Sequence, residues 1–264
     1  MTDFQDIRVS VRDGVGTIAI HRPGAHYACR AQTMDEICDA VAAISASPEI
    51  AAVVLTSTGK HFVTGAEFAF LQELARTPAL VVKDKVYKSF QGAARALWHC
   101  PKPTLCAFSG AAVTVGCELA LVCDYRIVSD TAFFQESWIK LGILPPLGGM
   151  MLLPRLVGLG PATDMVLRGR PMKAEEALRL GLVMEVVPAL ELEARRDAFA
   201  AELTAVASQA YAAAKQGLHR GLESTMEKEW AANVLAQAML LGSDDFKEGL
   251  DAVMNKRTPN FTGR

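Results

Sequence analysis

The chain has 264 residues, of which 51% are hydrophobic and 21% charged, enough apolar material for one large α/β domain or two smaller ones. Its formal net charge of −2 and its mixed acidic and basic residues offer no basic stripe to neutralise phosphates, so we expect no nucleic-acid partner. No apolar run approaches the roughly 18 residues that span a bilayer, and the N-terminus lacks the basic and apolar regions of a secretory signal, so we expect a cytoplasmic protein without membrane contact.

The first half of the chain predicts alternating strands and helices. Alternating apolar residues around Asp13-Gly14 predict a β-hairpin over residues 7–20. Thr33 and Glu36 form a capping-box pattern before apolar residues at helical spacing, which predicts a helix over 33–46. The uninterrupted apolar run 50–55 predicts a strand buried on both faces. Further helices are expected at 78–99 and 116–122, and further strands at 103–108 and 123–128, an order typical of parallel strands joined by right-handed crossovers.

The last third of the chain changes in character. A helix over 173–180 and an extended segment over 182–187 are followed, from about residue 190, by an almost wholly helical pattern with a second capping box at Ser224 and Glu227. We therefore predict an α/β core over 1–195 that carries the functional site. Residues 196–264 should form a helical region that serves oligomerisation or acts as a lid.

Cysteines and histidines do not indicate a metal site. The six cysteines form no C-x-x-C pair and have no histidine at ligand spacing, so we expect small buried hydrophobes rather than a disulfide or zinc site. His61 lies in a glycine-containing loop, where it faces either a substrate or solvent. Gly158 and Gly160 suit a turn between helices rather than a dinucleotide loop. No Gly-x-Ser-x-Gly elbow is present, which argues against a serine hydrolase.

Three segments, each near the end of a predicted strand, carry the residues with chemical potential. Residues 59–68 contain Gly65-Ala66-Glu67; residues 109–124 place Gly116 before an apolar helix with Glu118 in its first turn; residues 132–149 contain Trp138 and end in two glycines. The free N–H groups of a helix N-terminus suit an anion. An acid in the first helical turn is also an ordinary stabilising feature, so this motif alone leaves both readings open.

Taken together, the three segments resemble the enoyl-CoA hydratase/isomerase (crotonase) family. The resemblance rests on the Phe-x-x-Gly-Ala-acid loop, on Gly-Cys-Glu-Leu-Ala followed by Cys-Asp, and on Ala-x-Phe leading to Leu-Gly and Gly-Gly. It covers nearly the whole chain. It implies a crotonase (ClpP/crotonase-like) α/β fold, with repeated ββα units forming a spiral core and a C-terminal helical region. It also implies an acyl-CoA substrate, no metal, no permanently bound cofactor, and a homotrimer or dimer of trimers.

The resemblance assigns roles by position. The backbone amides of Ala66 and Val115 should form an oxyanion hole for the thioester enolate, each donor stabilising the transition state by about 3 kcal/mol. Glu118 aligns with a family acid/base glutamate. The coenzyme A side of the site should include Ala66, Glu67, Phe68 and Ala69, while Lys256 either approaches the nucleotide or is a solvated lysine.

The chain departs from the family pattern at two important positions. Trp138 stands where the second family glutamate is expected, and an indole N–H donates a hydrogen bond but exchanges no proton near neutral pH. Ordinary hydration is therefore in doubt, and Trp138 either contacts an aromatic or alicyclic acyl group or simply fills core volume. Glu136 is only two residues away, but we do not assume that it reaches the same point. Val115 replaces a glycine and would be strained if the position required a positive φ.

These features predict an acyl-CoA lyase or isomerase in which Glu118 moves a proton and Trp138 contacts the acyl group. Two alternatives remain open. One is an acyl-CoA hydrolase or decarboxylase driven mainly by the oxyanion hole, and the other is a non-catalytic protein that binds coenzyme A.

Overall fold

A six-stranded sheet forms the centre of the computed structural model, which describes residues 4–264. The strand order is β1-β2-β3-β4-β6-β9, with β1 and β2 antiparallel and the other pairs parallel. The strands are β1 Ile7–Arg12, β2 Val15–Ile20, β3 Ala52–Ser57, β4 Thr104–Phe108, β6 Tyr125–Ser129 and β9 Glu185–Val187. The predicted hairpin and the parallel strands are confirmed. Residues 1–3, part of the segment in which we expect no secretory signal, lie outside the described residues.

A second, three-stranded sheet places two of the three motif segments side by side. It comprises β5 Ala111–Val113, β7 Phe133–Gln135 and β8 Met172–Lys173, in the order β5-β7-β8. Strands β5 and β7 are parallel neighbours, with Val113 paired to Gln135. Because both strands run in the same direction, the residues that follow them, beginning with Thr114 and Glu136, emerge at the same edge.

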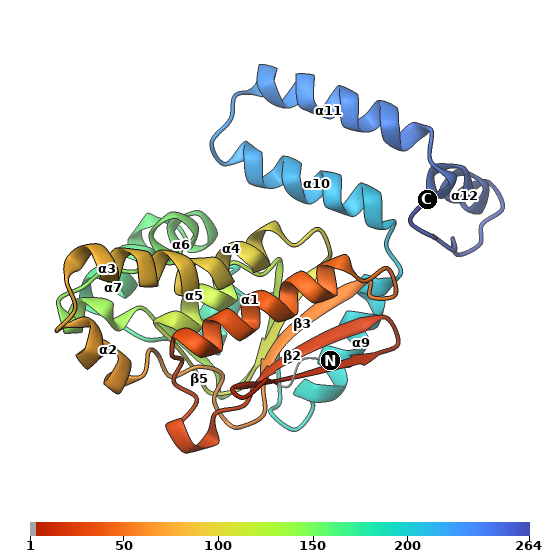
Figure 1. The fold of residues 1–264 in the computed structure, drawn as a ribbon. Coiled ribbons are helices and arrows are strands. Elements are labelled where there is room, and N and C mark those ends of the chain that lie inside the picture. Colours follow the sequence, from red (N-terminus) through yellow and green to blue (C-terminus); the bar gives the residue numbers. More distant parts are fainter. Residues whose placement is uncertain (1–3) are drawn as a thin grey trace.

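Helices cover both faces of the main sheet (Figure 1). Along β3, Val53 and Leu55 belong to the main hydrophobic core, which also contains the buried residues of α1 (Ala31–Ala46). The alternate residues Ala52 and Val54 pack with the buried side chains of α9 (Leu192–Thr204). The predicted strand buried on both faces is therefore confirmed.

The other helices also connect the strands around the site. The predicted helix over 78–99 is present as three successive pieces, the middle one a π-helical turn that interrupts the α-helical pattern. These elements are α2 Phe68–Leu74, α3 Ala79–Lys85, the π-helix Val86–Phe90, α4 Gln91–His99, α5 Val115–Leu121, α6 Gly149–Val157, α7 Leu159–Arg168 and α8 Ala174–Arg179, with short 3-10 turns at Pro23–Ala25 and Ser137–Leu141. The turn between α6 and α7 at Gly158 agrees with its predicted role.

Both predicted capping boxes are wrong. Helix α1 begins at Ala31, so Thr33 lies inside it, where its hydroxyl accepts from the Arg30 N–H at 3.2 Å. Glu36 accepts from the backbone N–H of Asp6 at 2.8 Å instead of from a helix-cap amide. The second box fails because α11 begins at Met226, preceded by Thr225 rather than by Ser224. In α1, the side chains of Thr33 and Glu36 also bind Asp6 in the N-terminal segment. A local sequence pattern does not reveal such a long-range contact.

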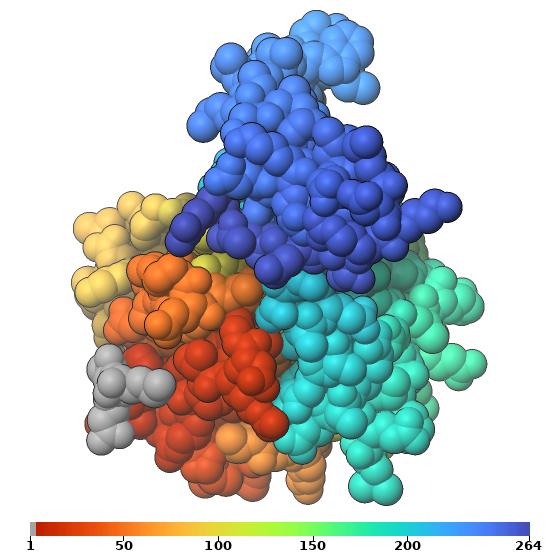
Figure 2. All heavy atoms as spheres, turned by 90° about the vertical axis from the view of Figure 1, so that its right-hand side faces the viewer, coloured from red at the N-terminus to blue at the C-terminus, as the bar shows by residue number. Residues whose placement is uncertain are grey.

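Three C-terminal helices project from the core: α10 Ser208–Gly221, α11 Met226–Leu241 and α12 Asp244–Met254 (Figures 1 and 2). Figure 2 shows them as the blue part standing above the core. The predicted boundary at residue 195 falls inside α9, which packs on the sheet, so the division into two units stays a prediction. No helix within residues 4–264 is long and apolar enough to cross a membrane. Five of the six cysteines are buried, as expected for small hydrophobes, and Cys38 is partly exposed.

Asp124 anchors α10 to the core. Its Oδ2 atom accepts hydrogen bonds from the Lys215 ammonium at 2.8 Å and the Tyr211 hydroxyl at 3.0 Å, both on α10. The same oxygen accepts from the backbone N–H and the hydroxyl of Thr104 on β4, each at 2.9 Å. The side chains of Asp124 and Lys215 are only 11% and 6% exposed. The ion pair is therefore largely shielded from water.

Asp124→Asn should lower the free energy of unfolding by about 3 kcal/mol, because Lys215 is left buried without its counter-charge. Urea denaturation measures this change. The matched control is Asp13→Asn, which removes the exposed Arg12–Asp13 pair and should change stability by less than about 1 kcal/mol. Equal effects of the two substitutions would contradict the anchoring role of Asp124.

Candidate active site

Two turns bring the backbone amides of Ala66 and Val115 to the same place. The N–H of Val113 donates to the Val63 carbonyl at 2.9 Å, which ties the two chain segments together. A Cβ on Gly65 would lie only 2.9 Å from the Thr114 hydroxyl oxygen, so the residues just before the two amides are in contact. Within residues 4–264, neither of the two amide N–H groups donates a hydrogen bond to another protein group. Both backbone N–H groups are therefore free to donate a hydrogen bond to one bound oxygen atom.

The backbone strain expected at Val115 falls instead on Thr114. Thr114 has φ 48°, whereas Val115 is the first residue of α5 and does not have a positive φ. The valine side chain is fully buried and does not line the cavity described below. A positive φ is unfavourable for a β-branched residue and costs on the order of 1–3 kcal/mol. Such strain is typical of functional turns.

Glu118 is fully buried, and three donors hold its carboxylate. Its Oε2 atom accepts from the backbone N–H of Leu147 at 2.7 Å and of Gly149 at 2.8 Å. Its Oε1 atom accepts from the indole N–H of Trp138 at 3.2 Å. Burial raises the pKa of Glu118 to about 7, although the hydrogen bonds to the charged form oppose this rise.

A cavity of about 750 Å³ lies against Trp138 and Ala66. The indole of Trp138 both lines this cavity and bonds to Glu118, so it connects the cavity to the buried carboxylate. The remaining lining is almost entirely apolar and comes from α2, α3, the π-helix and the segment after Trp138. It consists of Phe68, Phe70, Leu71, Gln72, Leu74, Ala75, Val82, Val86, Phe90, Leu141, Gly142, Ile143, Leu144 and Pro146. This surface suits an apolar acyl group.

Three of the expected substrate contacts do not lie at this cavity within one chain. The carboxylate of Glu67 pairs with Arg22 at 2.9 Å, and Ala69 is exposed and outside the cavity lining. Lys256 follows α12, which Figure 1 places at the opposite end of the molecule from α2 and α3. A coenzyme A contact by Lys256 therefore stays a prediction that requires a neighbouring chain.

His61 supports the loop behind the site. The Ala111 N–H donates to its Nδ1 atom at 3.2 Å, and burial lowers the pKa of the imidazole. A Cβ on Gly110 would lie 2.5 Å from the same Nδ1 atom, which explains why a glycine occupies this position. The ring nitrogen therefore binds the protein backbone instead of facing a substrate.

Glu136, to which the sequence alone assigns no role, lies beside Glu118 at the candidate site. It is fully buried, and its carboxyl lies beside that of Glu118, because one oxygen of each is 3.1 Å from the point where a Cβ on Gly149 would lie. The signal was the period of two in an extended segment: Phe134, Glu136 and Trp138 are all buried, whereas Phe133 and Gln135 are only partly so. The period of two therefore turns Glu136 inward with Phe134.

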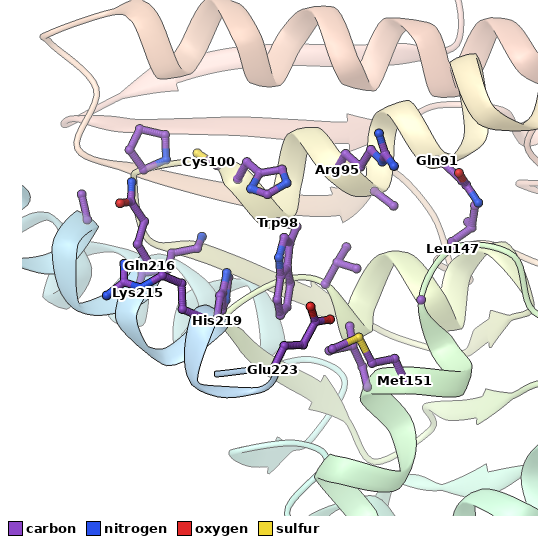
Figure 3. Close-up of a pocket in the computed structure, with 18 of the residues that line it drawn as sticks. Gln91, Arg95, Trp98, Cys100, Leu147, Met151, Lys215, Gln216, His219 and Glu223 are labelled. Carbon is purple, nitrogen blue, oxygen red and sulfur yellow. The ribbon is translucent and has the colours of Figure 1, made fainter. Parts of the chain in front are cut away.

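A second cavity of about 740 Å³ lies between α4, α6 and α10 (Figure 3). The Trp98 ring of α4 stacks on the His219 ring of α10, with centroids 3.4 Å apart and planes at 9°. Arg95, Lys215 and Glu223 also line this space. No local pattern indicated this cavity, because it forms only where α10 meets the core.

Comparison with known proteins identifies the class of this chain. Residues 10–264 match the family described as enoyl-CoA hydratase/isomerase. A Rhodobacter capsulatus protein named as a probable enoyl-CoA hydratase is 35% identical over 263 residues, 99% of each chain. A crotonyl-CoA hydratase of Syntrophomonas wolfei is 32% identical, again over 99% of each chain. A solved enoyl-CoA hydratase structure from Bacillus anthracis has a TM-score of 0.90 and 29% identity, covering 98% of this chain and all of that one.

The chain belongs to the enoyl-CoA hydratase/isomerase family and has the crotonase fold expected from its motifs.

The raised pKa of Glu118 predicts a pH-dependent stability. The pKa rises from the ordinary value of 4.5 to about 7 on folding, so the folded state binds more protons between these values and stability falls as pH rises through this window. Glu118→Gln removes this loss. The unfolding free energy of Glu118→Gln minus that of the unchanged protein should therefore increase by on the order of 3 kcal/mol between about pH 4 and pH 8.

Urea denaturation across this pH range measures the effect, with Glu49→Gln, a change at an exposed carboxyl, as control. A difference between Glu118→Gln and the unchanged protein that stays constant with pH would contradict the raised pKa.

Proposed function

We propose that the chain is an acyl-CoA lyase or isomerase that stabilises a thioester enolate between the amides of Ala66 and Val115. The observation that carries this proposal is the pair of unbonded N–H groups, one of them on Ala66 at the wall of an apolar cavity, together with the buried Glu118 carboxylate, which Trp138 links to the same cavity. Preorganised amides of this kind act where negative charge develops, and each contributes about 3 kcal/mol to the transition state.

In the proposed reaction, the Glu118 carboxylate takes a proton from a carbon next to the thioester. The C–H electron pair moves towards the thioester oxygen, where the two amides stabilise the charge. Glu118 then returns the proton to a different carbon of the conjugated enolate, which shifts the double bond and regenerates the carboxylate. A pKa of about 7 suits both steps, because a group that is partly ionised at neutral pH can accept and donate a proton. One proton carrier is enough for isomerisation, which favours this reaction over hydration.

The proposed acyl group is aromatic or alicyclic. Phe70 and Phe90 stack with ring centroids 5.2 Å apart, and both line the cavity with Trp138. Flat or cyclic groups pack well against such rings. We propose coenzyme A only as part of the substrate, with no metal or other cofactor, and a cytoplasmic place in fatty-acid or aromatic-acid metabolism.

Glu118→Gln should lower turnover of an acyl-CoA substrate by at least about a hundredfold, because an amide neither accepts nor releases a proton near neutral pH. Acyl-CoA affinity should change only a few-fold. A panel of enoyl-, β-keto-, malonyl- and aryl-CoA thioesters supplies the substrates, and Glu73→Gln on the exposed side of α2 is the control. Full activity of Glu118→Gln would contradict the mechanism and favour a hydrolase or decarboxylase. Binding without turnover across the panel would favour a non-catalytic protein.

We also propose that α10–α12 pack on a neighbouring copy in a homotrimer or a dimer of trimers. Large apolar side chains of α11 are exposed in the single chain, among them Trp230 at 64%, Leu235 at 70% and Met239 at 80%. Exposed apolar patches of this kind mark association surfaces.

Light scattering should therefore find trimers or hexamers, and Leu235→Glu with Met239→Glu should shift the protein towards monomer. Lys228→Glu, a charge change on the same helix, is the control. A monomeric unchanged protein would contradict the proposal.

A further inference from the structure

Glu136 is a buried carboxyl that the proposed reaction does not use. Within residues 4–264, both of its carboxyl oxygens are shielded from solvent and have no hydrogen-bond partner. A buried carboxylate without partners is strongly unfavourable, so such a group keeps its proton. Unsatisfied buried polar groups are rare in folded proteins, and one explanation for them is a functional role.

The surroundings of Glu136 come from three elements. From α5, the charge of the Glu118 carboxyl raises its pKa. The Cys117 thiol, also on α5, and the Trp138 indole, in the 3-10 turn Ser137–Leu141, act in the opposite direction, but burial is the largest influence and raises the pKa. Gly149, the first residue of α6, leaves room for both carboxyls, because a Cβ there would meet an oxygen of each at 3.1 Å. These two oxygens are therefore separated by no more than twice that distance.

The two carboxyls differ in how well they can carry a charge. Glu118 accepts from two backbone amides and an indole. In the described part of the chain, no group has hydrogen-bond geometry with Glu136, although the Cys117 thiol and the Trp138 indole lie near enough to lower its pKa. Two negative charges this close in an apolar interior repel strongly, so one group keeps its proton. The distribution of donors decides which one does.

We propose that Glu118 and Glu136 form a carboxyl pair that carries a single negative charge, located on Glu118, while Glu136 holds the proton. Glu136 is then a positioning residue: it acts through Glu118 and keeps a second negative charge away from the enolate. Burial and the charge of Glu118 raise the pKa of Glu136 well above its ordinary value, which agrees with this arrangement. Its role in turnover rests on the proposed function.

The proton balance of the proposed reaction follows from this pair. When Glu118 takes a proton from the substrate carbon, the C–H bond breaks and its electron pair moves to the thioester oxygen. The carboxyl pair is then neutral, and the single negative charge lies on the enolate between the two amides. When Glu118 returns the proton, the charge returns to Glu118. Glu136 keeps its own proton throughout, so the pair supplies one base and never two charges.

Infrared spectroscopy of the substrate-free protein tests the pair, because a protonated carboxylic acid has its own C=O stretching band. At about pH 8, above the pKa of Glu118, the protein should retain the band of one buried acid, and Glu136→Gln should remove it. Glu36→Gln changes a buried carboxyl outside the site and should leave the band in place. Persistence of the band in Glu136→Gln, or its absence from the unchanged protein, would overturn the proposal.

Glu118→Gln provides a second test that does not require the Glu136 variant to fold. Removing the charge of Glu118 should lower the proton affinity of Glu136 at least about tenfold, so its acid band should disappear at lower pH. If Glu136 only fills space, its titration is not coupled to Glu118. A band that disappears at the same pH in Glu118→Gln and in the unchanged protein would overturn the proposed carboxyl pair. Both tests use protein without substrate. They therefore remain decisive even if no acyl-CoA is turned over, which would refute the proposed function instead.

Discussion

The burial of the Glu118 carboxylate is the constraint on which the rest of the site depends. Burial alone disfavours the charged form, and the three hydrogen bonds from Leu147, Gly149 and Trp138 partly offset this cost. Trp138 lies in the 3-10 turn Ser137–Leu141, Leu147 in the loop that follows, and Gly149 at the start of α6. The same contacts therefore stabilise the charge, position the indole beside the apolar cavity and set the start of α6.

The backbone on the other side of the site is constrained by equally local geometry. Gly65 has φ 123° and Thr114 has φ 48°, and these two residues directly precede the two free amides. Gly116 permits the approach of the chains, since a Cβ there would lie 2.7 Å from the Val63 carbonyl oxygen. Because an amide donor is available from any residue except proline, Val115 can occupy a position where the family motif has glycine.

Much of the fold follows from local patterns, and the site follows from them only in part. The hairpin was predictable because its apolar residues alternate, α1 because its apolar residues recur at helical spacing, and the strand buried on both faces because its apolar run is uninterrupted. The first capping box failed because α1 begins two residues before Thr33 and Glu36 binds the N-terminal segment, and the second because α11 begins after Thr225. The motif order indicated where Glu118 and Trp138 lie in the chain, but no local rule shows that Glu136 meets Glu118 across β7, α5 and α6. That contact depends on tertiary packing.

The central claim is that one thioester oxygen binds between the amides of Ala66 and Val115. A crystal structure with a non-reactive acyl-CoA analogue tests this claim most directly. We expect the thioester oxygen within hydrogen-bonding distance of both nitrogen atoms, about 3 Å, with the acyl group in the cavity against Trp138. A thioester oxygen bound elsewhere, with both amides left without an acceptor, would contradict it.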